Sequence, residues 1–295
     1  MANTFGTLPT AVGTGVYKHD FEARLQTRLS KPVTFKDVCD VRYTNSMAIN
    51  FPYMSTEFVA QTGTRGTAYG FSDFTLTNDS LTLNVPKMVP VFIDRADLAQ
   101  CSYADQMDIA DRQGRLLLDQ VETTVLADHA AWTNVGDSAG AIASGVTSPI
   151  TVSATNIDDV VRGIRRIVAV ANGTDLMNQY GLFFVWRPAD FEALEQFAQA
   201  NGYNLADAAL KNGIERGYYL LGAYHYVSNS HASGGHVFAG VRKQHKVGIC
   251  TATWGKVVET VDPALQSGVG LIARADFGVK TPAGLSTILY DINVA

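Results

Sequence analysis

The sequence of 295 residues has few charged side chains for its length. Asp, Glu, Lys and Arg make up 17% of the residues, whereas soluble domains usually carry about a quarter. Much of the surface is therefore expected to consist of uncharged polar groups or to be covered by a partner. Hydrophobic residues make up 46%, without strict compositional bias, which excludes the disordered, collagen-like and coiled-coil classes. The length allows about two domains with a sizeable core.

Cysteine and long apolar segments are also scarce. The 3 cysteines, Cys39, Cys101 and Cys250, are far apart and form no C-x-x-C pair. They predict reduced thiols in a cytosol-like compartment rather than disulfides. No apolar run approaches the roughly 20 residues of a spanning helix, and the first cation, Lys18, comes after rather than before any apolar stretch. The sequence therefore predicts neither a membrane span nor a signal peptide.

Clustered positive charge is absent as well. The net charge is −5, and no run of lysine and arginine is longer than Arg165-Arg166. Proteins that bind duplex DNA gain affinity from counterion release where cations cluster. A dedicated duplex-binding function is therefore not expected.

One segment matches the nucleophile elbow of serine hydrolases. Gly136, Ser138 and Gly140 fit G-x-S-x-G, a motif that works when the serine lies on a strained turn between a buried strand and a helix. Here a predicted long helix precedes the motif, and a loop rich in Gly, Ala, Ser and Thr follows it. We therefore predict a flexible loop and domain boundary over residues 134–155, and keep a hydrolase using Ser138 as the least favoured function.

The histidines show no metal-ligand spacing. His231 and His236 flank a glycine pair, and His225 and His245 lie nearby, but no H-E-x-x-H or cysteine-containing pattern accompanies them. They are interpreted as surface and turn residues. The sequence thus predicts no metal, no cofactor and no catalytic set.

The periodicity of the first third predicts an arm followed by strands. Residues 1–32 are expected to form an extended arm with one short helix, 33–43 a strand, and 47–93 a long hairpin. The Gly/Thr segment Gln61–Thr67 divides the hairpin into two arms of about 15–20 residues, each reaching roughly 50 Å or more if extended. Because an isolated two-stranded ribbon is marginal in water, it is expected to lie on its own core or on a neighbouring subunit.

The rest of the chain predicts a long helix and then a mixed region. The helix covers 94–132, its main part begins at the capping box from Ser102, and its Leu117, Val121 and Val125 stripe is expected to pack on a sheet. A second helix starts at a capping box from Thr155 and stops at Asn172-Gly173. The remaining elements are a strand at 181–186, a helix from Pro188, and strands at 224–227, 236–241, 256–261, 270–275 and 286–292. The fold class is therefore α+β.

The order of these parts resembles that of tailed-bacteriophage major capsid proteins, which have the Hong-Kong-ninety-seven-type fold. Residues 1–32 resemble the N-terminal arm of that family, 45–92 its extended loop, 94–132 its spine helix and 155–270 its axial domain. The segments that carry the resemblance are Ile93–Gln100 entering the spine helix, Leu116–Leu126 in its later turns, Val185–Pro188 with Phe191 and Leu194, and Gly222 with Val227-Ser228-Asn229.

The resemblance implies a non-enzymatic shell subunit. It implies domains at 1–32 (arm), 33–154 (peripheral), 155–270 (axial) and 271–295 (C-terminal strands returning to the peripheral domain). It also implies contact between subunits through the tip of the extended loop, which comprises Thr62, Gly63, Thr64, Arg65 and Gly66. Lys87 is the loop's single lysine, so covalent crosslinking is not expected.

The expected partners follow from the same resemblance. They are other copies of the chain in pentamers and hexamers, a scaffolding protein and portal during assembly, and packaged double-stranded DNA held without sequence preference; no membrane partner is expected. The chain would reside in the virion, and in the host cytoplasm during assembly. No long charged helical segment precedes the arm, so a separate scaffolding protein, or a segment lost earlier, is expected. The alternative is the shell of an encapsulin-like compartment, which resembles the same fold but holds protein cargo.

Overall fold

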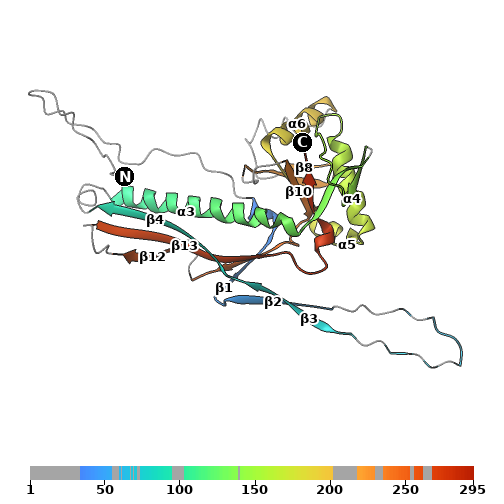
Figure 1. The fold of residues 1–295 in the computed structure, drawn as a ribbon, viewed down its shortest axis with the longest axis horizontal. Helices are drawn as coiled ribbons and strands as arrows, with labels where there is room; N and C mark the ends of the chain where they lie inside the picture. The colour runs from blue at the N-terminus through green and yellow to red at the C-terminus, as the bar shows by residue number, and fades with distance from the viewer. Residues whose placement is uncertain are drawn as a thin grey trace, which may run out of the picture.

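The computed structural model describes residues 34–54, 60, 62–66, 68, 70–71, 74–94, 103–138, 140–201, 218–229, 235–252, 256–261 and 268–295. The expected N-terminal arm lies outside these residues. Figure 1 shows a long helix lying along two strands, a group of shorter helices and strands at one end of it, and a hairpin that leaves the body. The predicted α+β class is confirmed. No helix in the described ranges combines the length and apolarity needed to cross a bilayer.

A seven-stranded sheet forms the centre of the group at one end of the long helix. In spatial order its strands are β6 (Ala141–Ser144), β5 (Thr133–Ser138), β14 (Leu289–Asn293), β10 (His236–Val241), β7 (Leu182–Trp186), β9 (Ala223–Val227) and β8 (Tyr218–Leu220). β14 pairs with β5 in parallel, as does β7 with β9, and the other pairs are antiparallel. The last strand in sequence is thus an interior strand of the sheet.

Strand β7 explains why this sheet is buried on both faces. All five of its residues are buried, as expected for a continuous apolar run. Leu182, Phe184 and Trp186 belong to a core shared with helices α4 (Ile157–Val170) and α6 (Pro188–Ala200). Phe183 and Val185 belong to a second core, shared with the long helix. Successive side chains of a strand point to opposite faces, so one strand supplies both cores.

A five-stranded sheet lies beside the long helix. It contains β1 (Asp40–Thr44), β11 (Lys246–Cys250), β13 (Gly268–Lys280) and β12 (Lys256–Val261) in that order, and β4 (Val85–Asp94) also pairs with β13. The β4–β13 ladder is antiparallel over ten residue pairs. β4, β11 and β12 all pair with β13, and β1 joins the sheet through β11.

The long helix α3 (Tyr103–Ala127) begins at the residue after Ser102 and continues as a short 3-10 turn, η1 (Asp128–Ala131). Leu117, Val121 and Val125 are buried in the second core, which confirms the predicted stripe. The same core takes Phe238 from one sheet and Phe277 from the other. The end of α3 therefore packs at the junction of the two sheets.

The hairpin consists of β2 (Ala48–Met54) and β3 (Leu76–Thr82), paired antiparallel from Ala48↔Thr82 to Met54↔Leu76. Figure 1 shows it projecting away from the body, beyond the sheet that contains β1. This confirms a hairpin within 47–93, but the returning arm is shorter than predicted. From Val85 onward the chain belongs to β4 in the body.

Several local predictions were wrong for identifiable physical reasons. The strand expected at 33–43 is a short helix, α1 (Phe35–Val38), followed by β1, because Phe35 and Val38 are both buried in one core. The loop expected at 134–155 contains the β5–β6 hairpin, which extends the seven-stranded sheet through β14. The cap of α4 is Asn156, whose side chain makes no capping bond. Its Oδ1 accepts the backbone N–H of Ser153 instead.

The two sheets cut across the domain boundaries that were expected. β5 and β6 come from 33–154 but lie in the seven-stranded sheet, together with β7, β8, β9 and β10 of 155–270. β11 and β12 come from 155–270 but lie in the five-stranded sheet, together with β4. The segment 271–295 divides between the two: β13 lies in the five-stranded sheet and β14 in the seven-stranded sheet, separated by η2 (Ser286–Ile288). Other predicted boundaries agree with the structure. β10 and β12 match, α6 has Pro188 at its start, and α5 (Thr174–Tyr180) follows the stop at Asn172-Gly173.

Candidate functional site

The predicted contact residues lie at the far part of the hairpin. Thr62, Gly63, Thr64, Arg65 and Gly66 are all exposed, and the last two form a turn. Gly66 has a φ of 86°, a left-handed conformation that glycine adopts without steric cost. The structure thus presents this tip to solvent, and it stays a predicted contact.

On strand β3, the leucine at the base of the hairpin is buried and the leucine at the outer end is exposed. Leu81 is 1% exposed at the base, whereas Leu76, at the outer end of the same strand, is 65% exposed. Other large apolar side chains on the hairpin and its flanks are also exposed, namely Met47, Tyr53, Met54, Phe71 and Phe74. Contiguous exposed apolar surface marks an interaction site. The described outer residues of the hairpin therefore present several apolar side chains to solvent.

Two glycines let the base of the hairpin lie directly on the five-stranded sheet. A Cβ at Gly248 would come within 2.7 Å of a methyl carbon of Leu81, and a Cβ at Gly278 would overlap the backbone carbonyl of Thr82. Only glycine permits so close an approach of one backbone to another. The base of the hairpin is therefore held on the five-stranded sheet by close packing rather than by a long hydrogen-bonded ladder.

An ion pair adds to this attachment. The Lys280 ammonium lies 3.0 Å from a carboxylate oxygen of Asp79 on β3. The Asp79 carboxylate also accepts the backbone N–H of Ala283 at 2.9 Å. Although burial opposes them, these hydrogen bonds and the ammonium lower the pKa of Asp79. The hairpin is therefore tied to β13 and to the turn after it.

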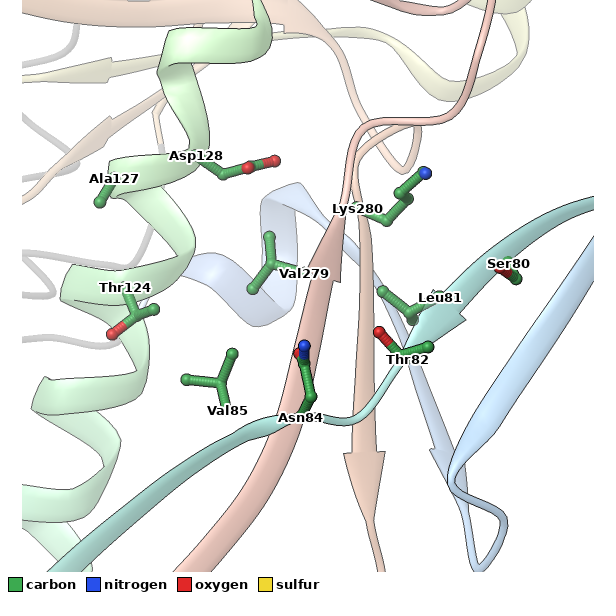
Figure 2. A pocket seen from close by; sticks show the side chains of 10 residues that line it. All are labelled: Ser80, Leu81, Thr82, Asn84, Val85, Thr124, Ala127, Asp128, Val279 and Lys280. Atoms are coloured by element: carbon green, nitrogen blue, oxygen red, sulfur yellow. The ribbon is translucent and has the colours of Figure 1, made fainter.

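A hollow of about 450 Å³ lies where the hairpin joins the body. Figure 2 shows side chains from the end of α3, from β13 and from the β3–β4 connection around it. Its lining residues are Ser80, Leu81, Thr82, Asn84, Val85, Thr124, Ala127, Asp128, Val279 and Lys280. Burial raises the pKa of Asp128, although its carboxylate accepts a hydrogen bond from Thr281. The lining comes from both hairpin and body, so the hollow changes shape if the hairpin changes direction.

A buried carboxylate joins three distant segments beside the second core. The Glu122 carboxylate on α3 accepts the Thr34 N–H at 2.9 Å, the Thr34 hydroxyl at 2.7 Å and the Ser228 hydroxyl at 3.0 Å. Burial raises the pKa of Glu122 despite these bonds. Ser228 belongs to a segment that the sequence analysis noted, but its partner could not be identified from sequence because the two residues lie far apart in the chain.

The histidines are not the surface residues that were predicted. His225 and His245 are each 1% exposed, and burial lowers the pKa of each to about 4. The Trp186 indole N–H donates to His225 Nδ1, so Nε2 carries the proton and donates to the Leu220 carbonyl. This imidazole is a neutral structural element of the first core. His231 lies outside the described residues.

A further histidine pair meets a carboxylate that the sequence analysis did not connect with it. His236 and His129 each lie with Nδ1 2.9 Å from an oxygen of Asp291. The three residues come from β10, η1 and β14, which the sequence separates widely. No local spacing signal could have found this cluster, because only the sheet topology brings it together.

Ser138 is not part of a nucleophile elbow. It is exposed, ends β5, and pairs with Ala141 across the tight turn to β6. A nucleophile elbow needs a helix directly after the serine. The structure places an edge strand there instead.

Comparison with solved structures gives matches over nearly the whole chain. A structure from Mycobacterium phage Che8 has a TM-score of 0.65 at 14% identity and covers 96% of this chain and 98% of its own. The capsid of an empty GTA particle gives 0.65 at 12% identity, with 95% of each chain covered. The mature capsid of bacteriophage PhiM1 gives 0.60 at 13% identity, with 95% of this chain and 92% of that one covered. No protein-family model and no curated protein matches the sequence.

These matches confirm the expected architecture. The chain has the Hong-Kong-ninety-seven-type fold of phage capsid structures. Identities of 11–16% establish this likeness in fold alone.

Proposed function

We propose that this chain is the major capsid protein of a tailed phage and that it assembles through pentamers and hexamers into an icosahedral shell around double-stranded DNA. The observation that carries the proposal is the hairpin. Its described outer residues carry exposed apolar side chains, from Leu76 at 65% exposed to Phe71 at 100%. A second copy of the chain covers them in the shell.

The hairpin is built to reach a neighbour rather than to fold back. Its base is held by glycine contacts and by the Lys280–Asp79 ion pair, so its direction is set by the body. Its outer part makes a two-stranded sheet on its own, which is marginal in water without a surface to pack on. The tip, with Arg65 as its cation, is proposed to contact the adjacent subunit.

Non-enzymatic containment is the mechanism that fits these features. A shell subunit needs complementary surfaces, not a reactive constellation, and the exposed position of Ser138 at the end of β5, followed by strand β6 rather than a helix, gives no support to a hydrolase. The encapsulin-like alternative is not favoured, because the solved structures with this fold include phage and GTA capsids. The nucleic-acid content of isolated particles separates a genome from protein cargo.

Contact with DNA is proposed to be weak and non-specific. With a net charge of −5 and no clustered cations, the inner surface can neutralise few phosphates, and closed geometry contains the genome without strong binding. The cations expected to face inward are Arg24, Arg28 and Arg112, of which the first two lie outside the described residues. Isolated capsomers should bind duplex DNA at about 10⁻⁴–10⁻⁶ M at physiological salt. Nanomolar affinity with base preference would contradict this.

The test of the proposal combines a deletion with matched point variants. Deleting about residues 56–73 should leave a folded monomer by circular dichroism and abolish shells in electron micrographs of concentrated protein. Leu76→Ser should do the same because it removes exposed apolar surface, whereas Asn78→Ser, also exposed on β3, should leave assembly intact. A wild-type chain that stays a monodisperse monomer under all assembly conditions would contradict the proposal. Loss of the fold in the deletion would instead show that the hairpin packs internally.

A further inference from the structure

Three potential metal ligands meet where the end of the long helix contacts the seven-stranded sheet. His129 lies in η1, His236 begins β10 and Asp291 lies in β14. The two imidazole Nδ1 atoms approach different oxygens of the same carboxylate, each at 2.9 Å. One ligand atom from each residue lies within 4.8 Å of the other two. The two rings are 4.8 Å apart between centroids.

The charge balance of this cluster favours a cation. The Asp291 side chain is only 6% exposed, and among the described residues its ion-pair partners are these two histidines. A buried carboxylate is costly unless an opposite charge compensates it. No lysine or arginine of the described ranges pairs with Asp291, so a metal ion held between the carboxylate and the two imidazoles would supply an opposite charge at this position.

We propose that His129, His236 and Asp291 form a binding site for Zn²⁺. Two imidazole nitrogens and one carboxylate oxygen are a ligand set that Zn²⁺ accepts, with water in the fourth tetrahedral position. Coordination of the ion through both Nδ1 atoms, with the proton of each neutral imidazole on Nε2, keeps both histidines facing Asp291 and places an opposite charge beside the buried carboxylate. The His236 side chain is 30% exposed and that of His129 is 18% exposed, so the site is open to water and to ions.

The geometry requires modest adjustment. Ligand atoms of a tetrahedral zinc site are about 3.3 Å apart, given metal–ligand distances of about 2.0–2.2 Å. Each imidazole Nδ1 already lies 2.9 Å from one oxygen of Asp291, His129 from Oδ2 and His236 from Oδ1, so one of the two nitrogens has to move toward the oxygen that binds the ion. The two imidazole nitrogens have to approach each other, and their partly exposed side chains have room to rotate. The buried Asp291 provides the fixed point.

Metal binding at this position would fasten the end of α3 to two interior strands of the sheet. Each ligand comes from a different element, so the three ligands lie together only in the folded chain and the ion would link the three elements. A ligand that binds only the folded state stabilises it by mass action. The site thus acts as a brace between helix and sheet, independent of any contact between subunits.

The test uses the untagged full chain, freed of metal with a chelator. Titration with Zn²⁺ by calorimetry should give one ion per chain, and the melting temperature should rise with it. Co²⁺ should show the visible absorption of tetrahedral nitrogen and oxygen coordination. A purely hydrogen-bonded cluster predicts no uptake and no thermal shift, and that result in the wild type overturns the proposal.

Substitutions of the two histidines test whether the metal binds at these residues. His236→Asn keeps a hydrogen-bond donor toward Asp291 but should weaken Zn²⁺ binding at least tenfold; His129→Asn serves as the second variant if the first does not fold. His225→Asn is the matched control, because His225 Nδ1 and Nε2 are both engaged by Trp186 and Leu220. It should lower the melting temperature yet keep the Zn²⁺ response. Unchanged affinity in both cluster variants would place the metal elsewhere and refute the site.

Discussion

The stripe of α3 that faces the second core offers a quantitative test of the fold. Leu117 is 2% exposed within that core, whereas the next residue along the helix, Leu116, is 51% exposed. Leu117→Ala removes three carbon groups from a fully packed site, worth about 2.4 kcal/mol at about 0.8 kcal/mol each. The cavity left behind adds to this, so we expect a total loss of about 3–4 kcal/mol, within the usual range for buried Leu→Ala changes.

The neighbouring leucine is the matched control for this substitution. Leu116→Ala makes the same chemical change on the same helix at a half-exposed position, so its effect on the isolated subunit should stay within about 0.5 kcal/mol. Urea unfolding of both variants, followed by circular dichroism, gives the two free energies, and the melting temperature of Leu117→Ala should fall by roughly 5–10 °C. Equal losses in the two variants, or an unchanged melting temperature for Leu117→Ala, would refute the assignment of this stripe to the core.

Three further predictions concern buried charge and the hairpin base. Glu122→Ala leaves buried donors unbonded and should cost about 1–3 kcal/mol for each. The free energy of unfolding of Glu122→Gln, relative to that of the wild type, should increase as the pH rises above 4.5. The reason is that the raised pKa of Glu122 makes its ionisation unfavourable in the folded state. A difference in free energy that stays constant across pH would count against this. The depressed pKa values of His225 and His245, about 4 each, predict stability that is present above pH 6.5 and lost as the pH falls toward 4, by up to about 1.4 kcal/mol per pH unit for each. Their ring-proton NMR signals should not titrate above about pH 5 in the folded chain, and titration near 6.5 would disprove their burial as neutral groups. Gly278→Ala places a Cβ against the backbone of β3 and should displace the hairpin and prevent assembly, whereas Gly114→Ala, which meets nothing within 4 Å, should leave assembly intact; normal shells from Gly278→Ala would show that this approach can relax.

Elements governed by local signals could be predicted from the sequence. Proline fixes the first turn of α6, and Asn172, with a φ of 59°, lies just after the end of α4, as its residue type indicates. The buried run of β7 was recognisable because every residue in it is apolar. In each case the information lies within a few residues of the element itself.

Features that depend on distant partners could not be predicted. Val33, Phe35, Val41 and Tyr43 alternate as in a strand. Phe35 and Val38, three residues apart, instead lie in one core with residues of α3 and β11, and the segment between them is helical. The Gly/Ser-rich residues 134–144 form strands because β14, more than 140 residues later, offers them an edge. The contact of Asp291 with two histidines likewise exists only after the sheet has formed.

The position of β14 between β5 and β10 has a consequence for the order of folding. Strands whose partners are far apart in sequence pair late, because the chain must close a long loop before contact energy is gained. During synthesis, β10 and β7 can pair soon after they emerge, but β5 and β6 have no place in the sheet until residues 289–293 arrive. The seven-stranded sheet of a nascent chain therefore remains incomplete until β14 is made. Pulsed hydrogen exchange should accordingly show protection in β7 and β10 before protection in β5.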